Sequence, residues 1–159
     1  MSLKNLITDR TAQDVDRVKN LMAKAWQDMT TAERTEWLSP MKGAYNYTDL
    51  NRVGSALNYV RDRLAEAGRV PADVFTARED WTRDEIPTRS EMDAYLGYVS
   101  MVRGALAQLS TTPAAPTDPN ALDYNAANAI EQILIDVDEL ITRMADIYFF
   151  SGDLYAGEV

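Results

Sequence analysis

Residues 41–54, Met41-Lys-Gly-Ala-Tyr-Asn-Tyr-Thr-Asp-Leu-Asn-Arg-Val-Gly54, lead a glycine-and-aromatic turn directly into an amphipathic helix. Gly43 permits the turn, and Thr48 or Asp49 is expected to cap the helix. Gly54 indicates either a close approach by another segment or a tolerated defect. Apolar residues then recur at helical spacing up to Gly68, which supplies a left-handed C-terminal position. This stripe consists of Leu50, Val53, Leu57, Val60, Leu64 and Ala67.

Two helices are expected before this turn. The first follows Thr11, a good N-cap, and its apolar stripe is Val15, Val18, Met22, Ala25 and Met29. A short helix then spans about Thr31 to Leu38, with Thr30 as its cap. It ends at Ser39-Pro40, because the residue before a proline avoids the α region.

Two long helices are expected after the turn. Thr88-Arg-Ser-Glu91 is a capping box, and an apolar stripe follows it from Met92 to Leu109. The last helix runs from about Tyr124 to Phe150, and its apolar residues keep a 4-3 spacing; they are Ala126, Ile130, Ile133, Val137, Leu140, Met144 and Ile147.

Two connectors join these long helices. Residues 69–87 contain Trp81 and Ile86, which are expected to anchor the connector to the core. Residues 110–119 are rich in proline and form a stiff linker to the last helix. No segment shows sustained strand alternation. The pattern predicts an all-α fold, in which residues 1–159 form a single domain. We expect an antiparallel helical bundle of four main helices plus one short helix.

The chain contains no cysteine and no histidine. Thiol nucleophiles, zinc–thiolate sites and histidine-based catalysis are therefore excluded within it. Asp136, Asp138 and Glu139, together with Glu131 and Asp146, are expected to lie off the core stripe of the last helix, so inward-facing metal ligands are not indicated. We expect no enzymatic activity, no cofactor and no metal site.

The net charge of −9 is concentrated in the last third of the chain. Residues 111–159 hold one basic and nine acidic residues, whereas residues 1–68 hold ten basic and nine acidic ones. The acidic part repels nucleic-acid backbones and anionic membranes, and no apolar run approaches the roughly 20 residues that span a bilayer. We expect no nucleic-acid and no membrane partner. The acidic residues form either a solvated helix surface or a docking face for a basic partner.

Aromatic and apolar residues outside the predicted core stripes are the candidates for contact with a partner. They are Tyr45, Asn46 and Tyr47 in the turn, Ile135, Phe149 and Phe150 on the last helix, and Tyr155 in the tail. Clustered exposed apolar groups mark interfaces, where tyrosine is enriched. The alternative is a structural duty: the helix residues would be covered by the tail or the first helix, and the turn residues would serve only the fold.

An ordered set of segments spans nearly the whole chain: 6–11, 14–18, 41–46, 48–54, 80–81, 84–88, 95–96, 128, 131, 134, 136–138 and 151–158. In these segments the chain resembles an uncharacterised family of proteins encoded in phages and prophages of gut Firmicutes. The resemblance implies a structural protein of the virion, part of a tail, baseplate or fibre, synthesised in the bacterial host cytoplasm. Its partners would be other phage structural subunits, including copies of itself in a homo-oligomer. It carries over no active site. The alternative is a soluble acidic phage-encoded binder that inhibits or regulates a host protein.

Overall fold

The fold consists of helices and the turns between them. The computed structural model describes residues 3–152, and of residues 146–152 it describes the backbone alone. The described residues contain no strand. Their helices are α1 Ala12–Met22, α2 Thr31–Leu38, α3 Tyr47–Glu66, α4 Arg89–Gly104 and α5 Tyr124–Gly152, with 3-10 turns η1 Leu3–Asn5, η2 Trp26–Asp28 and η3 Pro119–Ala121. The predicted all-α helical bundle is confirmed.

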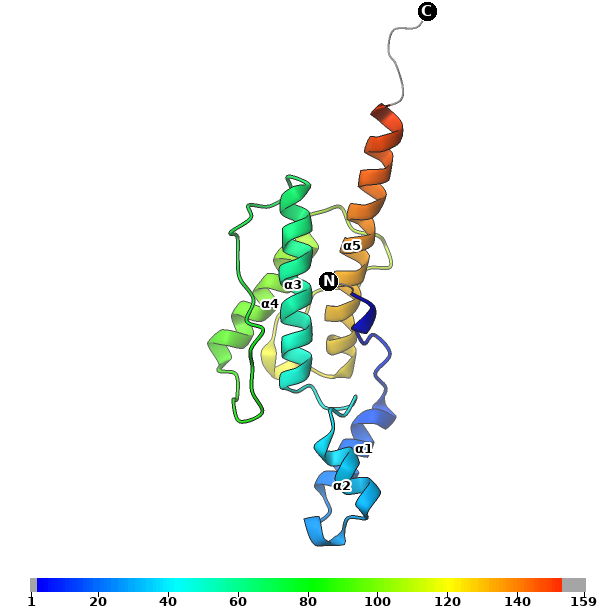
Figure 1. The fold of residues 1–159 in the computed structure, drawn as a ribbon, viewed down its shortest axis with the longest axis vertical. Helices are drawn as coiled ribbons and strands as arrows, with labels where there is room; N and C mark the ends of the chain where they lie inside the picture. Colours follow the sequence, from blue (N-terminus) through cyan, green and yellow to red (C-terminus); the bar gives the residue numbers. More distant parts are fainter. Residues whose placement is uncertain (1–2, 153–159) are drawn as a thin grey trace, which may run out of the picture.

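Helices α3, α4 and α5 pack on one another as the bundle, and they run in the same direction (Figure 1). Arg52 near the start of α3 pairs with Glu131, and Arg63 near its end pairs with Asp138, so α3 and α5 advance together. This corrects the antiparallel direction expected for the long helices. Short loops make neighbouring helices antiparallel, but the connectors 67–88 and 105–123 are long enough to return along the bundle.

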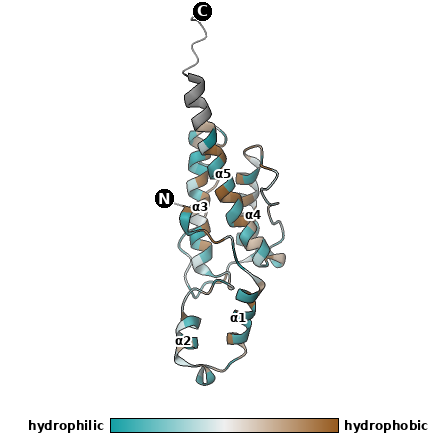
Figure 2. Cartoon of the chain, turned by 90° about the vertical axis from the view of Figure 1, so that its right-hand side faces the viewer, coloured by the Kyte–Doolittle hydropathy of each residue, from teal (hydrophilic) through white to brown (hydrophobic). Residues whose placement is uncertain are grey.

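Helices α1 and α2 form an antiparallel pair at one end of the bundle (Figures 1 and 2). Arg17 pairs with Glu36 at 2.6 Å, and Lys24 pairs with Glu33 at 2.6 Å. Hydrogen bonds from the Lys24 ammonium and the Thr30 backbone N–H lower the pKa of Glu33 from 4.5 to about 2. The pair is therefore joined by ion pairs on its surface.

The first helix is shorter than its apolar stripe predicts. It ends at Met22, and the chain then forms η2, whose carbonyl groups are held by α2: Arg34 Nε donates to Trp26 O at 3.0 Å. Met29 is buried, but it follows η2 and is not part of α1. Met22, the last residue of α1, is 67% exposed. The prediction of a helix through Met29 is wrong beyond Met22, because a contact with a later helix replaces the continuation.

Capping boxes begin the helices where the sequence predicts them. Thr11 with Asp14, Thr30 with Glu33 and Thr88 with Glu91 each exchange hydrogen bonds between side chain and backbone. Gly68 has the predicted left-handed conformation, with φ of 66°. Helix α4, however, ends at Gly104, before Leu106 and Leu109 of its predicted stripe.

The core lies between α3, α4 and α5. Its fully buried side chains include Leu57, Leu64, Leu96, Ile130, Ile133 and Leu134. Trp81 of the first connector is buried against them, which confirms its role as an anchor. Ile86 is 88% exposed, so its expected anchoring is wrong. The turn at Thr82–Glu85, closed by a 3.2 Å backbone hydrogen bond, redirects the chain before Ile86.

Residues 77–81 of the first connector run along α3 and are fastened to it by asparagine side chains. Asn58 accepts from Ala77 N–H at 2.8 Å and donates to Ala77 O at 2.9 Å. Asn51 makes the same two bonds with Trp81, at 2.7 and 2.8 Å. Between them, a Cβ added to Gly54 would lie 2.2 Å from the Arg78 carbonyl oxygen. Gly54 is thus required by a close approach of backbone.

Candidate interaction site

The start of α3 is capped by Asn46, which corrects the predicted cap at Thr48 or Asp49. Asn46 Oδ1 accepts from Thr48 N–H at 2.9 Å, and Asp49 Oδ2 accepts from Asn46 N–H at 3.0 Å. Asparagine is among the best N-cap residues, since its short side chain reaches the free N–H groups of the first turn. One oxygen of Asp49 remains available for other partners.

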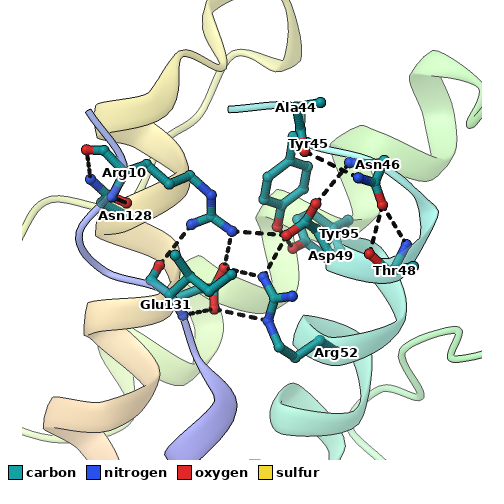
Figure 3. A network of polar contacts seen from close by, with 11 residues as sticks. Arg10, Ala44, Tyr45, Asn46, Thr48, Asp49, Arg52, Tyr95, Asn128 and Glu131 are labelled. Atoms are coloured by element: carbon teal, nitrogen blue, oxygen red, sulfur yellow. Dashed lines mark hydrogen bonds and ion pairs between the residues drawn. The ribbon is translucent and has the colours of Figure 1, made fainter. Parts of the chain in front are cut away.

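Asp49 belongs to a buried network that joins the N-terminal segment, α3 and α5 (Figure 3). Glu131 Oε1 accepts from Nη2 of Arg10 at 2.6 Å and of Arg52 at 2.8 Å. Glu131 Oε2 accepts from Ile7 N–H at 2.5 Å and from Arg52 Nε at 3.2 Å. Asp49 Oδ1 accepts from the same two arginines, at 2.9 and 2.5 Å. Two guanidinium groups are therefore balanced by two carboxylates.

The same network fixes the backbone of the N-terminal segment. Asn128 of α5 accepts from Arg10 N–H at 3.0 Å and donates to Arg10 O at 2.9 Å. Arg10 Nη1 donates to Ile7 O at 2.7 Å. Residues 7–10 are thus held on α5 immediately before α1 begins, which places the α1–α2 pair relative to the bundle.

The burial of Glu131 contradicts the expectation that the acids of the last helix lie off the core. Its side chain is fully buried, and Asp136 is 7% exposed and accepts from Thr112 Oγ1 at 2.7 Å. The apolar stripe of α5 marks one buried face. The N-terminal segment and the Pro-rich linker bury further faces, and they do so with polar partners.

Tyr45 lies in the same region rather than on a free loop tip. Its hydroxyl hydrogen-bonds to that of Tyr95 on α4, and the Arg10 guanidinium lies 5.5 Å from its ring centre. Burial raises the pKa of both tyrosine hydroxyls above the ordinary value of 10, so both stay protonated near neutral pH. Tyr45 therefore joins the turn to the bundle.

The segment before α3 is wedged between α1 and the bundle. A Cβ on Gly43 would lie 2.1 Å from the Asp14 carbonyl oxygen, so this turn lies against the backbone of α1. A cavity of about 340 Å³ lies on one side, lined by residues that include Arg10, Val15 and Tyr45. Tyr45 also borders a larger groove, so the turn forms part of the walls of both.

The larger groove, of about 600 Å³, lies where the α1–α2 pair meets the bundle. Its walls are mainly apolar and come from α1, α2, the turn before α3, the end of the first connector and the start of α4; they include Met22, Trp37, Leu38, Pro40, Met41, Tyr47, Ile86, Pro87 and Met92. Three of these side chains are strongly exposed: Met22 at 67%, Leu38 at 57% and Ile86 at 88%. We call this surface the junction groove.

The candidate contact residues fall into three groups. Tyr45 and Asn46 have the structural duties described above, although both also line the junction groove, as Tyr47 does. Ile135 is half-buried on α5. The side chains of Phe149 and Phe150, and all of Tyr155, lie outside the described residues. Contact of any of these residues with a partner stays a prediction.

Sequence reasoning missed the exposed residues of the junction groove. Met22 belongs to a predicted core stripe, Leu38 ends a short predicted helix, and Ile86 precedes a proline. Each looks like an ordinary core or anchor residue within its own segment. One local signal is present: Leu38 and Ile86 each lie within two residues of a proline and outside the middle of any helix, where burial depends on distant segments.

The described part of the chain contains no group of three acidic side chains placed to hold a metal ion. Within it, no helix combines the length and apolar character needed to cross a membrane. The chain matches no protein-family model, no curated protein and no solved structure.

Proposed function

We propose that the protein is a structural component of a phage particle, part of a tail, baseplate or fibre, and that it acts through protein–protein contacts without enzymatic activity. The junction groove carries this proposal. A groove with three large apolar side chains exposed at 57–88% is costly in water and gains free energy when a partner covers it. The assignment to a virion comes from the resemblance of the ordered sequence segments to phage-encoded proteins.

The buried acids support a structural rather than a catalytic role. Asp49 and Glu131 are each held by two arginines, and Asp136 by a threonine hydroxyl. Carboxylates in this position orient segments. A general acid or base needs a proton-transfer partner in a substrate cleft. The network instead gives the α1–α2 pair a defined position, which a docking surface requires.

Mass spectrometry of purified particles tests this proposal. Bacteria that produce the phage would express tagged wild-type protein, the groove variant Leu38→Glu with Ile86→Glu, or the control Met101→Glu. Met101 is an apolar residue of α4 outside the groove, and it is 40% exposed. We expect the wild type and the control to co-purify with particles at fixed stoichiometry, and the groove variant to be lost.

The competing function is a soluble inhibitor of a host protein, favoured by the acidic last third of the chain. It predicts that the wild type stays in the particle-free lysate and is captured there with a host protein in a salt-sensitive complex. That outcome would overturn the virion proposal.

A further inference from the structure

Residues 11–44, which contain α1 and α2, have a small core of their own. Its buried side chains are Val18, Leu21 and Met29. In the described part of the chain, the continuous core between α3, α4 and α5, and the apolar residues that pack on it, come from outside residues 11–44. Figures 1 and 2 show the α1–α2 pair standing at the end of the bundle. We call residues 11–44 the arm.

The chain passes between the arm and the bundle at Arg10 and at Tyr45, and these two passages lie side by side (Figure 3). The Arg10 guanidinium lies 5.5 Å from the centre of the Tyr45 ring, and Lys42 pairs with Asp9 at 2.8 Å. Both passages are fastened to the bundle, Arg10 by the buried network and Tyr45 by the hydroxyl of Tyr95. Two attachments that lie together fix an axis and leave rotation about it, as in a hinge.

Open space separates the arm from the bundle on both sides of this hinge. The cavity of about 340 Å³ has Val15 of α1 on one wall and Ala127 of α5 on another. The junction groove of about 600 Å³ lies between Leu38 of α2 and Ile86 of the first connector. Tyr45 lines both spaces. Protein interiors are close-packed, so the arm does not meet the bundle through a packed interior, and motion between the two is expected.

The two walls of the junction groove are suited to contact each other. Both are apolar: the arm contributes Met22, Trp37 and Leu38, and the opposite wall contributes Ile86, Pro87 and Met92. The charges of Arg83 and Glu85 on that wall are opposite and do not oppose an approach. A swing of the arm toward this wall removes exposed apolar surface of both walls from water, which is favourable. The cavity on the other side of the hinge widens as the groove narrows.

We infer that the arm swings as a unit about the hinge at Arg10 and Tyr45. The junction groove then has an open form, which the structure describes, and a closed form in which its two walls meet. A partner that binds the groove selects the open form, and the closed form shields the apolar walls in its absence. The inference gives the regulation of the surface that carries the proposed function. It rests on that function only for the partner, because the swing is a property of the isolated chain.

Distances between pairs of spin labels in the purified full-length protein test the inference. The chain contains no cysteine, so labels attach only where a cysteine is introduced. The arm pair is Ala32→Cys on α2 with Ala94→Cys on α4, and the control pair is Glu66→Cys on α3 with Ala94→Cys. All three side chains are exposed. We expect double electron–electron resonance to give two distances for the arm pair, one for each form of the groove, and one distance for the control pair.

Polar replacement of the groove walls should change the populations of the two forms. Leu38→Ser with Ile86→Ser removes apolar contact that is made only on closing, and it should lower the ratio of closed to open molecules at least about tenfold. The matched control is Met101→Ser, an exposed apolar residue of α4 outside the groove, which should leave this ratio unchanged. Circular dichroism would verify that all variants are folded.

An arm-pair distance distribution that the groove substitutions leave unchanged overturns the inference, whether it has one maximum or two. An equal change with Met101→Ser also overturns it, since the groove walls would then have no special part in the motion. These measurements involve no phage particle. Failure of this inference is therefore distinguishable from failure of the proposed function, which the particle co-purification experiment tests.

Discussion

Replacing Glu131 by glutamine removes one charge from the buried network while keeping the size of the side chain. The amide presents one oxygen and one NH₂ group, so two of the four donors that now meet carboxylate oxygens would face another donor. Of the two carboxylates that now pair with Arg10 and Arg52, only that of Asp49 would remain. Removing one partner of a buried ion pair costs about 3–5 kcal/mol. Because the Arg52 side chain is 18% exposed and keeps some water, we expect the lower bound, about 3 kcal/mol.

Urea unfolding followed by far-ultraviolet circular dichroism measures this loss. With an m-value of roughly 2 kcal/mol/M, a loss of about 3 kcal/mol lowers the midpoint by about 1.5 M. The matched control is Glu139→Gln, since Glu139 is 50% exposed and pairs with Arg143 one turn away. We expect the control to change stability by less than about 0.5 kcal/mol. Equal midpoints for the two variants would refute the reasoning, because the network would then contribute no more than a surface pair.

Four other substitutions should alter stability, or its dependence on pH, in defined directions. Gly54→Ala forces its Cβ against a connector carbonyl and should cost about 1–3 kcal/mol in urea unfolding. A Cβ on Gly97, in the middle of α4, would have no neighbour within 4 Å, so Gly97→Ala should raise the free energy of unfolding by about 0.5–1 kcal/mol. A Gly54→Ala variant more stable than Gly97→Ala would contradict the structure. Thr112→Val removes the hydroxyl donor to buried Asp136 and should lower the free energy of unfolding by about 1–3 kcal/mol. The pKa of Glu33 is lowered in the fold from 4.5 to about 2, so its stabilising contribution is complete above pH 4.5 and lost as the pH falls toward 2. Glu33→Gln should show less of this acid-dependent loss in thermal melts.

Helix starts could be predicted from the sequence because their signals are local. A threonine and an acid three residues later satisfy each other's hydrogen bonds within one turn, as at Thr11, Thr30 and Thr88. The buried stripe of α3 was equally readable, since Val53, Leu57 and Val60 repeat at helical spacing. The sequence did not single out Asn46 as the cap, because Asn46, Thr48 and Asp49 lie within four positions and all have side chains that can cap a helix.

The candidate site depends on contacts between distant residues, and no local pattern indicates them. Glu131 is buried because residues 7–10 cross α5 more than a hundred positions away in sequence, bringing Arg10 to it. A single sequence shows an acid beside an apolar stripe and nothing of its partner. The direction of the long helices was missed for a related reason: the path of each connector depends on its contacts with distant residues, such as those of Asn51 and Asn58 with residues 77–81. The single-domain organisation and the roles of the candidate contact residues stay predictions.

The shared direction of α3, α4 and α5 has an electrostatic consequence. Each helix carries about half a positive charge at its N-terminus and half a negative charge at its C-terminus, and parallel helices add these where antiparallel ones cancel them. Together the three place roughly 1.5 charges of each sign toward opposite ends of the bundle. The molecule is thus an electric dipole along its long axis before side chains are counted (Figure 1). Salt screens such a dipole over about 10 Å at 0.1 M, so it acts on an approaching charged molecule mainly at low ionic strength.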